Sequence, residues 1–418
     1  MTRGDVSRGS QPFRSLLSAA VFLGCSMIGL PDAWTPASWP PVPPVARSEQ
    51  GHRPPGSTTR IGAPRLELVE RTDTGSQPKS VNVSPDGSRV VVCNFGFRDH
   101  DNVWVYDAQT LDHIGTVTFQ GNAVETAFSH DGHILYVSNF RGAKVMVVDM
   151  ATLTVRGEID VGLDPKTIVV SPDGTRLYVA NYAGHSVSVV DAVRLVELRR
   201  IPAGNQPRGM AVSADGRLFV AAFRDHMTHV FDPARDYAET SQIPMCQFPR
   251  NLALSPDDSR LYVSCSGVRV VHWHQVSDGR RTGIVPVGQN PRSLDISDNG
   301  RYIAVANFDS SSVSLIDTVA LTHRTTTIPG TQRIVGVAIR PGDALRVYAT
   351  SWNNNRLYAL EPAGQRRHGA ASSQPATSTT VDAGAGAGQT PPSATPARGA
   401  GDADSRPGQA AASAGGTP

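Results

Sequence analysis

A unit of about 42 residues recurs along the middle of the chain, and no other feature limits the fold as strongly. The clearest copy runs from Asp164 to Gly204 and contains an apolar run, a Ser-Pro-Asp-Gly turn, a second apolar run, a polar loop and two further runs. A proline followed by a basic residue opens five copies, at Pro78-Lys79, Pro165-Lys166, Pro207-Arg208, Pro249-Arg250 and Pro291-Arg292, and the last four pairs are 42 residues apart. Counting the turns gives seven copies, at 84–87, 129–132, 171–174, 213–216, 255–258, 297–300 and 340–343.

Each copy predicts four short strands. The runs are rich in β-branched and aromatic residues, Asp-Gly between two of them is a strong hairpin signal, and no segment between residues 60 and 362 has a helical period. The aspartates in the turns and those that end the third runs are interpreted as structural, because Asp side chains accept hydrogen bonds from nearby backbone amides in turns. A period near 42 with four strands predicts an all-β fold, a seven-bladed β-propeller with four-stranded blades.

The seventh copy lacks its fourth strand, because a low-complexity tail begins soon after Leu360. A single unassigned strand-like run, Arg65 to Arg71, precedes the first copy. We therefore expect this N-terminal run to supply the outer strand of the last blade and to close the ring.

The repeats resemble a known family. LYVSN at 135–139, LYVAN at 177–181 and VSVVD at 187–191 look like the YVTN-type β-propeller repeats of bacterial surface and periplasmic proteins, and the resemblance covers residues 60–362. It implies the propeller fold and is poorly specific for function. More distantly, these repeats are similar to propellers of lactonases, of lyases and of haem-d1 or quinoprotein electron-transfer enzymes, among which fold does not choose.

The two ends of the chain differ from the repeats. Three arginines precede an apolar stretch that ends at Cys25, so residues 1–25 are predicted to be a signal peptide. The sequence before Cys25 resembles a bacterial lipobox except for Phe22, which leaves open a lipidated Cys25, a plain cleaved signal or an uncleaved anchor. Residues 26–59 read as a Pro-rich linker, 60–362 as the propeller and 363–418 as a disordered Ala/Gly/Ser/Pro-rich tail. A lipidated Cys25, a cleaved signal and an uncleaved anchor all predict an exported protein of the bacterial cell envelope.

Composition excludes several partners and cofactors. The formal net charge is +2 and no basic run occurs, so we expect no nucleic-acid partner, and we expect a monomer that meets a membrane only through its N-terminus. No Cys-x-x-Cys or Cys-x-x-Cys-His occurs, which excludes c-type haem attachment and common zinc knuckles. No cofactor and no metal site are predicted. By alignment, Cys246 starts an inner strand and Cys265 ends the neighbouring one, so the two are predicted to form a disulfide.

Successive copies are expected to place like side chains on one face, where second strands end and first strands begin, close to the central channel. One partial ring is made of asparagines: Asn94, Asn139, Asn181 and Asn307. A second, one residue further on, is aromatic: Phe95, Phe140, Tyr182, Phe223, Phe308 and Trp352. A third is cationic: Lys79, Lys166, Arg208, Arg250 and Arg292, with Arg333 nearby. The second copy interrupts the cations with Val124 and places Glu125 beside it.

These rings predict a cationic, aromatic-rimmed channel mouth that binds a protein partner or an anionic or carbohydrate-like ligand, because Arg suits carboxylate and phosphate and flat rings stack. The predicted ligand-binding residues are Lys79, Lys166, Arg208, Arg250, Arg292, Phe140, Tyr182, Phe223, Phe308 and Trp352. The alternative is that the aromatics pack between blades and the cations are a solvated rim.

Two loops support a different function. Asp99 and His100 lie in a long loop of the first copy, and Asp225 and His226 lie in the fourth. Asp and His serve in acid–base catalysis, so the alternative hypothesis is a lactonase- or lyase-like propeller enzyme that uses these four residues. A third hypothesis is an electron-transfer propeller that holds a cofactor in the same mouth. We favour a non-enzymatic binding scaffold.

Overall fold

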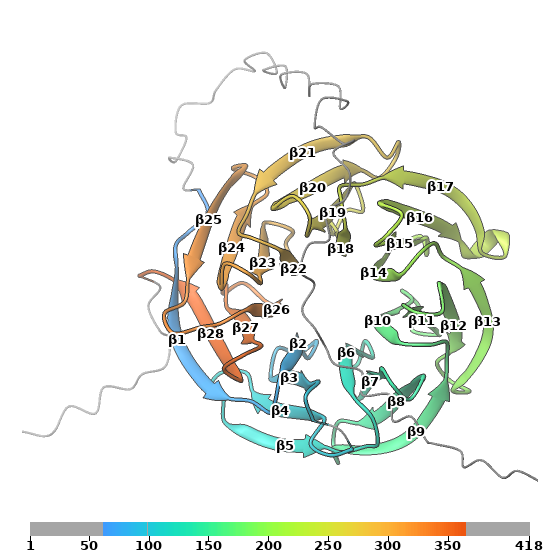
Figure 1. Cartoon of the computed structure of the whole chain (residues 1–418), viewed down its shortest axis with the longest axis horizontal. Coiled ribbons are helices and arrows are strands. Elements are labelled where there is room, and N and C mark those ends of the chain that lie inside the picture. The colour runs from blue at the N-terminus through green and yellow to red at the C-terminus, as the bar shows by residue number, and fades with distance from the viewer. Residues whose placement is uncertain (1–61, 98, 365–418) are drawn as a thin grey trace, which may run out of the picture.

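The computed structural model describes residues 62–97 and 99–364. In this part of the chain, seven four-stranded antiparallel sheets are arranged in a ring around a common axis (Figure 1). The prediction of an all-β, seven-bladed propeller is therefore confirmed. The predicted signal peptide with Cys25, the Pro-rich linker and almost all of the tail lie outside the described residues.

The strands take four equivalent positions in the blades. The inner strands are β2 (Pro78–Val83), β6 (Ala123–Phe128), β10 (Pro165–Val170), β14 (Pro207–Val212), β18 (Pro249–Leu254), β22 (Pro291–Ile296) and β26 (Ile334–Ile339). The second strands are β3 (Arg89–Asn94), β7 (Ile134–Asn139), β11 (Arg176–Asn181), β15 (Leu218–Ala222), β19 (Arg260–Cys265), β23 (Tyr302–Asn307) and β27 (Val347–Ser351). The third strands are β4 (Val103–Asp107), β8 (Lys144–Asp149), β12 (Ser186–Asp191), β16 (Met227–Asp232), β20 (Val270–Gln275), β24 (Ser312–Asp317) and β28 (Arg356–Pro362).

The outer strands are β5 (His113–Val117), β9 (Thr154–Asp160), β13 (Val196–Pro202), β17 (Ala238–Pro244), β21 (Arg281–Pro286), β25 (Thr322–Thr327) and β1 (Leu66–Asp73). A short 3-10 helix, η2 (Pro233–Arg235), precedes β17. No helix in residues 62–97 and 99–364 is long and apolar enough to span a membrane.

The ring is closed as predicted by the first strand of the chain. β1 pairs antiparallel with β28, from Leu66 opposite Pro362 to Asp73 opposite Arg356. The last blade therefore has the order β1-β28-β27-β26, and Figure 1 shows the first and last strands side by side. Leu66 is only 1% exposed and packs in one apolar cluster with Ile328 and Leu360. The closing strand thus adds both backbone hydrogen bonds and core surface.

The core lies between neighbouring blades. Seven apolar clusters fill the seven interfaces around the ring, and each takes side chains from adjacent sheets. The second strands are buried along nearly their whole length, whereas the outer strands alternate between buried and exposed positions. Because each sheet packs on both faces, no blade can bury its own surface alone.

The recurring turns have the local chemistry expected of them. In the third blade, Ser171 Oγ donates to the Asp173 carboxylate, which also accepts from the Thr175 N–H at 3.0 Å, and Gly174 takes a left-handed φ of +71°. These hydrogen bonds, the one from Ser171 first, lower the pKa of Asp173 to about 2. Asp191 at the end of β12 accepts from two backbone N–H groups of the next turn. The aspartates on this face therefore hold turns.

Candidate functional site

Each cation of the predicted ring directly follows a proline at the start of an inner strand. In β10, Pro165 is opposite Asn181, but the next aligned pair is Ile168 with Val179, so β10 carries one extra residue over this step. The same irregularity follows the opening proline of β14, β18 and β22, and a similar one occurs in β2. A bulge of this kind redirects the side chain that it carries. The repeat thereby presents its Lys or Arg to the channel.

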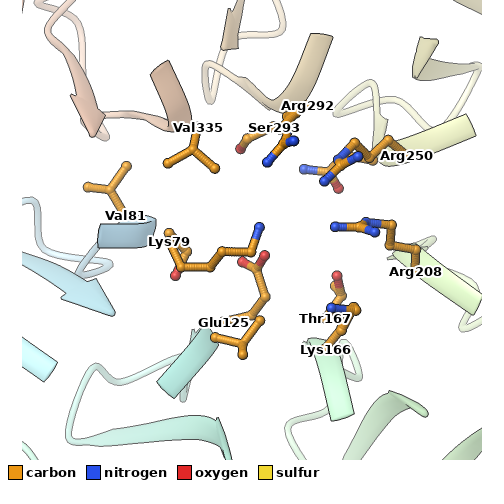
Figure 2. A pocket seen from close by; sticks show the side chains of 13 residues that line it. Lys79, Val81, Glu125, Lys166, Thr167, Arg208, Arg250, Arg292, Ser293 and Val335 are labelled. Atoms are coloured by element: carbon orange, nitrogen blue, oxygen red, sulfur yellow. The ribbon is translucent and has the colours of Figure 1, made fainter. Parts of the chain in front are cut away.

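The five cations converge on one small cavity at the centre of the ring. The cavity has a volume of about 50 Å³, which is room for a few water-sized groups. Its wall is completed by neutral residues and one carboxylate: Ser80, Val81, Val124, Glu125, Thr167, Asn251, Ser293 and Val335. Figure 2 shows the ends of the Lys79, Arg208, Arg250 and Arg292 side chains directed inward with the Glu125 carboxylate, and Val81 and Val335 to one side.

The positive charges in this cavity are not neutralised by neighbouring groups. Among the described residues, none of the five cationic side chains forms a hydrogen bond or an ion pair within 4.0 Å. The Nε of Arg292 is fully buried without a hydrogen-bond partner in that part of the chain. Five basic side chains therefore face one carboxyl group, that of Glu125. Unpaired buried donors and clustered like charges are both unfavourable.

Burial and the neighbouring cations lower the pKa values of these side chains. Burial, and then the nearby Arg208, Arg250 and Arg292, hold the pKa of Lys79 well below its ordinary value. Burial also lowers the pKa of Lys166 well below its ordinary value, and it lowers that of Arg292 to about 9. A bound anion would oppose each of these shifts, so the electrostatics of the cavity favour negative charge.

The aromatic side chains that the sequence places at one repeat position lie among these cations. Lys166 Nζ is 4.4 Å from the ring centre of Phe140 and 4.6 Å from that of Tyr182, and the Arg292 guanidinium is 3.2 Å from the centre of Phe308. The remaining contacts alternate in the same way: Lys79 with Trp352, Arg208 with Tyr182 and Phe223, Arg250 with Phe223, and Arg333 with Phe308. Cation–π contacts hold a charged group over a ring face without neutralising it. The aromatics therefore form a collar that orients the cations.

The aromatic collar also joins neighbouring blades. Phe95 contacts both Phe140 and Trp352, with 5.9 Å between ring centres in each case. Phe223 contacts Phe248 with tilted rings, and Phe248 lies in the loop before β18, where the repeat pattern does not identify it. Packing between blades and contact with the cations, which the sequence presents as alternatives, thus occur together.

The asparagine ring has a structural role. Asn181 Nδ2 donates to the hydroxyls of Ser186 and Ser188, and Asn307 Nδ2 donates in the same way to Ser312 and Ser314. All four asparagines are buried at 2% exposure or less. Asn181 and Asn307 thus fasten second strands to third strands, whereas the amides of Asn94 and Asn139 donate to the loop carbonyls of Asp101 and Gln120. None of the four lines the cavity.

The four alternative catalytic residues lie on loops around the mouth, in blades 1 and 4. Asp99 accepts a hydrogen bond from the Gly121 N–H, and Asp225 accepts one from the Asn205 N–H. His226 Nδ1 accepts from the Phe248 N–H at 3.0 Å, and burial lowers its pKa. His100 contacts the adjacent Asp101. None of the four residues lines the cavity.

The fifth blade contains a disulfide. Cys246 and Cys265 are bonded with their Cα atoms 5.7 Å apart. Cys246 lies in the loop before β18, which begins at Pro249, and therefore does not start an inner strand. His272 brings a ring nitrogen within 4.8 Å of both sulfur atoms, but the disulfide already engages these sulfurs. Burial raises the pKa of the remaining described cysteine, Cys93, to about 12, so it stays a thiol.

From the sequence, Glu125 was noted only as the neighbour of Val124, which interrupts the cationic ring. In the structure it is the carboxylate that lines the cavity, and its backbone is held by two hydrogen bonds with Ser138 Oγ. The sequence distinguishes Glu125 only by its position in the repeat. Glu125 is the third residue of an inner strand, where the other blades have small or neutral residues: Ser80, Thr167, Gly209, Asn251, Ser293 and Gly336.

Comparison with known proteins agrees with the fold. Residues 73–232 match a family described as "Lactonase, 7-bladed beta-propeller". The matched segment is less than half of the 418 residues. No curated protein matches the chain.

Solved structures of different function share the architecture. Hydrazine synthase of Kuenenia stuttgartiensis is similar with a TM-score of 0.61 at 20% identity, covering 75% of this chain and 99% of that one. The β-propeller domain of Cps50 (Swd1) from Myceliophteria thermophila is similar with a TM-score of 0.61 at 14% identity, covering 71% and 99%. At such identities the likeness shows the fold alone.

Proposed function

We propose that the channel mouth is a binding site for an anionic ligand. The observation that carries this proposal is the convergence of Lys79, Lys166, Arg208, Arg250 and Arg292 on one small cavity, with no ion pair among the described residues. Cations held together in a half-buried space repel one another, and a bound anion removes that penalty. Carboxylate and phosphate groups fit Arg donors best.

The dimensions of the site restrict the ligand. A cavity of about 50 Å³ admits one small anionic group. The aromatic collar around it offers flat, apolar contact surface to whatever carries that group. The ligand is therefore a small anion, or an anionic group on a sugar or on a partner's loop that rests on the collar.

The test is a calorimetric titration of the purified protein with inorganic phosphate and with small carboxylates at low ionic strength. Binding is expected for the native channel and not for a channel whose arginines have been reversed in charge. Added salt should weaken binding, because the interaction is electrostatic. If no small anion binds at low salt, the cationic ring is only a solvated rim.

A second candidate function is lactone hydrolysis, which the family match over residues 73–232 favours. The cavity holds the groups that such a reaction needs. Glu125 would take a proton from water as hydroxide adds to the lactone carbonyl, and Arg208 or Arg250 would stabilise the oxyanion. The ring C–O bond then breaks, and its oxygen receives the proton. The product, a hydroxy acid, is itself an anion.

A panel of five- and six-membered lactones tests this second function. Glu125→Gln should lower kcat by about 10²- to 10⁴-fold, the usual contribution of a general base. The double variant His100→Ala with His226→Ala should keep its turnover. The opposite pattern would assign the reaction to the loop residues Asp99, His100, Asp225 and His226. Without turnover of any lactone by the native protein, hydrolysis is rejected and binding alone remains.

Location at the bacterial envelope is also a proposal. It is supported by the N-terminal signal-like pattern and by the likeness of the repeats to YVTN-type propellers. Cys25→Ala should shift the protein from the membrane fraction to the soluble fraction on cell fractionation, because the lipid attachment site is lost. Membrane retention equal to that of the unmodified chain would argue against lipidation.

A further inference from the structure

Glu125 differs in chemistry from the rest of the cavity wall. Lys and Arg side chains only donate hydrogen bonds, whereas an ionised carboxylate only accepts them. The cavity thus contains several charged donors and one charged acceptor. Figure 2 shows the carboxylate directed into the same space as the guanidinium groups of Arg208, Arg250 and Arg292.

The position of this acceptor is fixed by the fold. The Glu125 N–H donates to Ser138 Oγ at 3.0 Å, and that hydroxyl donates back to the Glu125 carbonyl at 3.2 Å. Ser138 is fully buried, at 0% exposure. The side chain therefore starts from a rigid point on β6. Neither Lys79 nor any other described cation comes within 4.0 Å of the carboxylate, so its acceptor capacity is not used by an ion pair.

An anion that only accepts hydrogen bonds is poorly matched to this wall. Sulfate or acetate would satisfy the cations, but its oxygens would face the Glu125 carboxylate without a proton between them. Hydrogen phosphate, or a carboxylate with a hydroxyl on the next carbon, carries a donor of its own. Such an anion can accept from the cations and donate to Glu125 at the same time. A site built to pair with a ligand hydroxyl rejects the analogue that lacks it.

We propose that Glu125 makes the channel selective for anions that carry their own hydroxyl group, such as hydrogen phosphate or a 2-hydroxy carboxylate, over anions without one. This inference rests on the proposed function, since it names the class of anion that the cationic cavity takes. It identifies Glu125 as the residue that determines specificity, whereas the five cations supply affinity.

The selectivity should depend on pH in a defined direction. Burial raises the pKa of Glu125, and Lys79 of β2, Arg208 of β14, Lys166 of β10 and Arg250 of β18 oppose the rise. Arg292 of β22 lines the same cavity, and the buried thiol of Cys93 on β3 is close enough to interact electrostatically with Glu125. Below its pKa, Glu125 is protonated and can donate to acetate or sulfate. Preference for the hydroxylated anion should therefore be present at neutral pH and disappear on acidification.

The experiment is a calorimetric titration of the full chain with two matched pairs, hydrogen phosphate against sulfate and glycolate against acetate. At neutral pH the native protein should prefer the hydroxylated member by at least about tenfold, the equivalent of one hydrogen bond to a charged group. Glu125→Gln should reduce this preference to less than about threefold, because a neutral amide donates as well as accepts. Glu158→Gln, which changes an exposed glutamate of β9 in the same blade, should keep the preference.

The outcomes separate this inference from the proposed function. If no anion binds the native protein, the proposed function fails and the inference fails with it. If both members of each pair bind equally, the channel binds anions but Glu125 does not select among them. A preference that persists in Glu125→Gln also overturns the inference. A preference in only one pair supports it and identifies the ligand as a phosphate or as a hydroxy carboxylate. Acidification of the native protein gives a readout that requires no variant.

Discussion

Replacing Arg208 and Arg250 together by glutamate is expected to weaken binding of inorganic phosphate by at least about 100-fold. Each hydrogen bond to a charged group contributes about 1.5–3 kcal/mol, and two are lost here. The new carboxylates also repel the ligand. The measurement is a calorimetric titration at low salt with the native protein and the double variant side by side.

The same substitutions should not impair folding. In the native channel five cations face one carboxylate, whereas in the variant Lys79, Lys166 and Arg292 face Glu125 and two new glutamates. Repulsion is replaced by attraction, so the temperature of unfolding should stay the same or rise.

A matched control has the same change in net charge on the outside of the ring. Arg194→Glu with Arg324→Glu alters two exposed side chains far from the inner strands and should bind phosphate as the native protein does. Equal weakening in the control would mean that net charge alone governs binding. Undiminished binding in the channel variant would remove the cationic ring from the site.

Removing the closing strand is expected to have the largest effect on stability. A chain that begins at Gly75 lacks β1, so the backbone edge of β28 is left unpaired and the apolar side chains of the last blade are exposed. An open, apolar strand edge pairs readily with other chains. We expect this chain to be aggregated or to unfold at a temperature lower by at least about 10 °C, a shift that corresponds to several kcal/mol in a chain of this size.

The control is a chain that begins at Gly62 and retains β1, which should unfold as the full chain does. A milder variant, Leu66→Ala, keeps the backbone pairing and removes one buried side chain. It should lower the free energy of unfolding by about 2–5 kcal/mol, measured by urea denaturation. A chain from Gly75 that stays monomeric with unchanged unfolding would show that the ring holds without its closing strand.

The fold could be predicted because its determinants are local and repeated. Ser171, Asp173 and Gly174 form their turn from side chains within a few residues, and the spacing of such turns fixes strand length and blade number. Ring closure followed from counting, since one strand was missing at the end and one was in excess at the start. The structure places the closing strand at Leu66–Asp73, close to the predicted run.

The site could be predicted only where it follows the repeat. The cations occupy one repeat position, so their convergence follows from radial symmetry. The role of Glu125 does not follow from the repeat, because it depends on the cations that five other blades bring to the same cavity. Asn181 shows that a shared repeat position does not by itself place a side chain in the site. It shares the register of the ring, but hydrogen bonds to Ser186 and Ser188 turn its side chain into the blade, and no spacing rule reveals that direction.

The seven blades are alike, but the cavity wall that they form is not symmetric. The guanidinium groups of Arg208, Arg250 and Arg292 form one arc, Glu125 stands apart from them, and Val81 with Val335 forms an apolar side (Figure 2). Three chemically different groups around one small cavity can distinguish the two enantiomers of a ligand. In a 2-hydroxy carboxylate larger than glycolate, such as lactate, the saturated carbon presents three matching groups, namely carboxylate, hydroxyl and alkyl. The channel therefore has handedness, and one enantiomer of such a ligand should fit it while the other must leave one group unmatched.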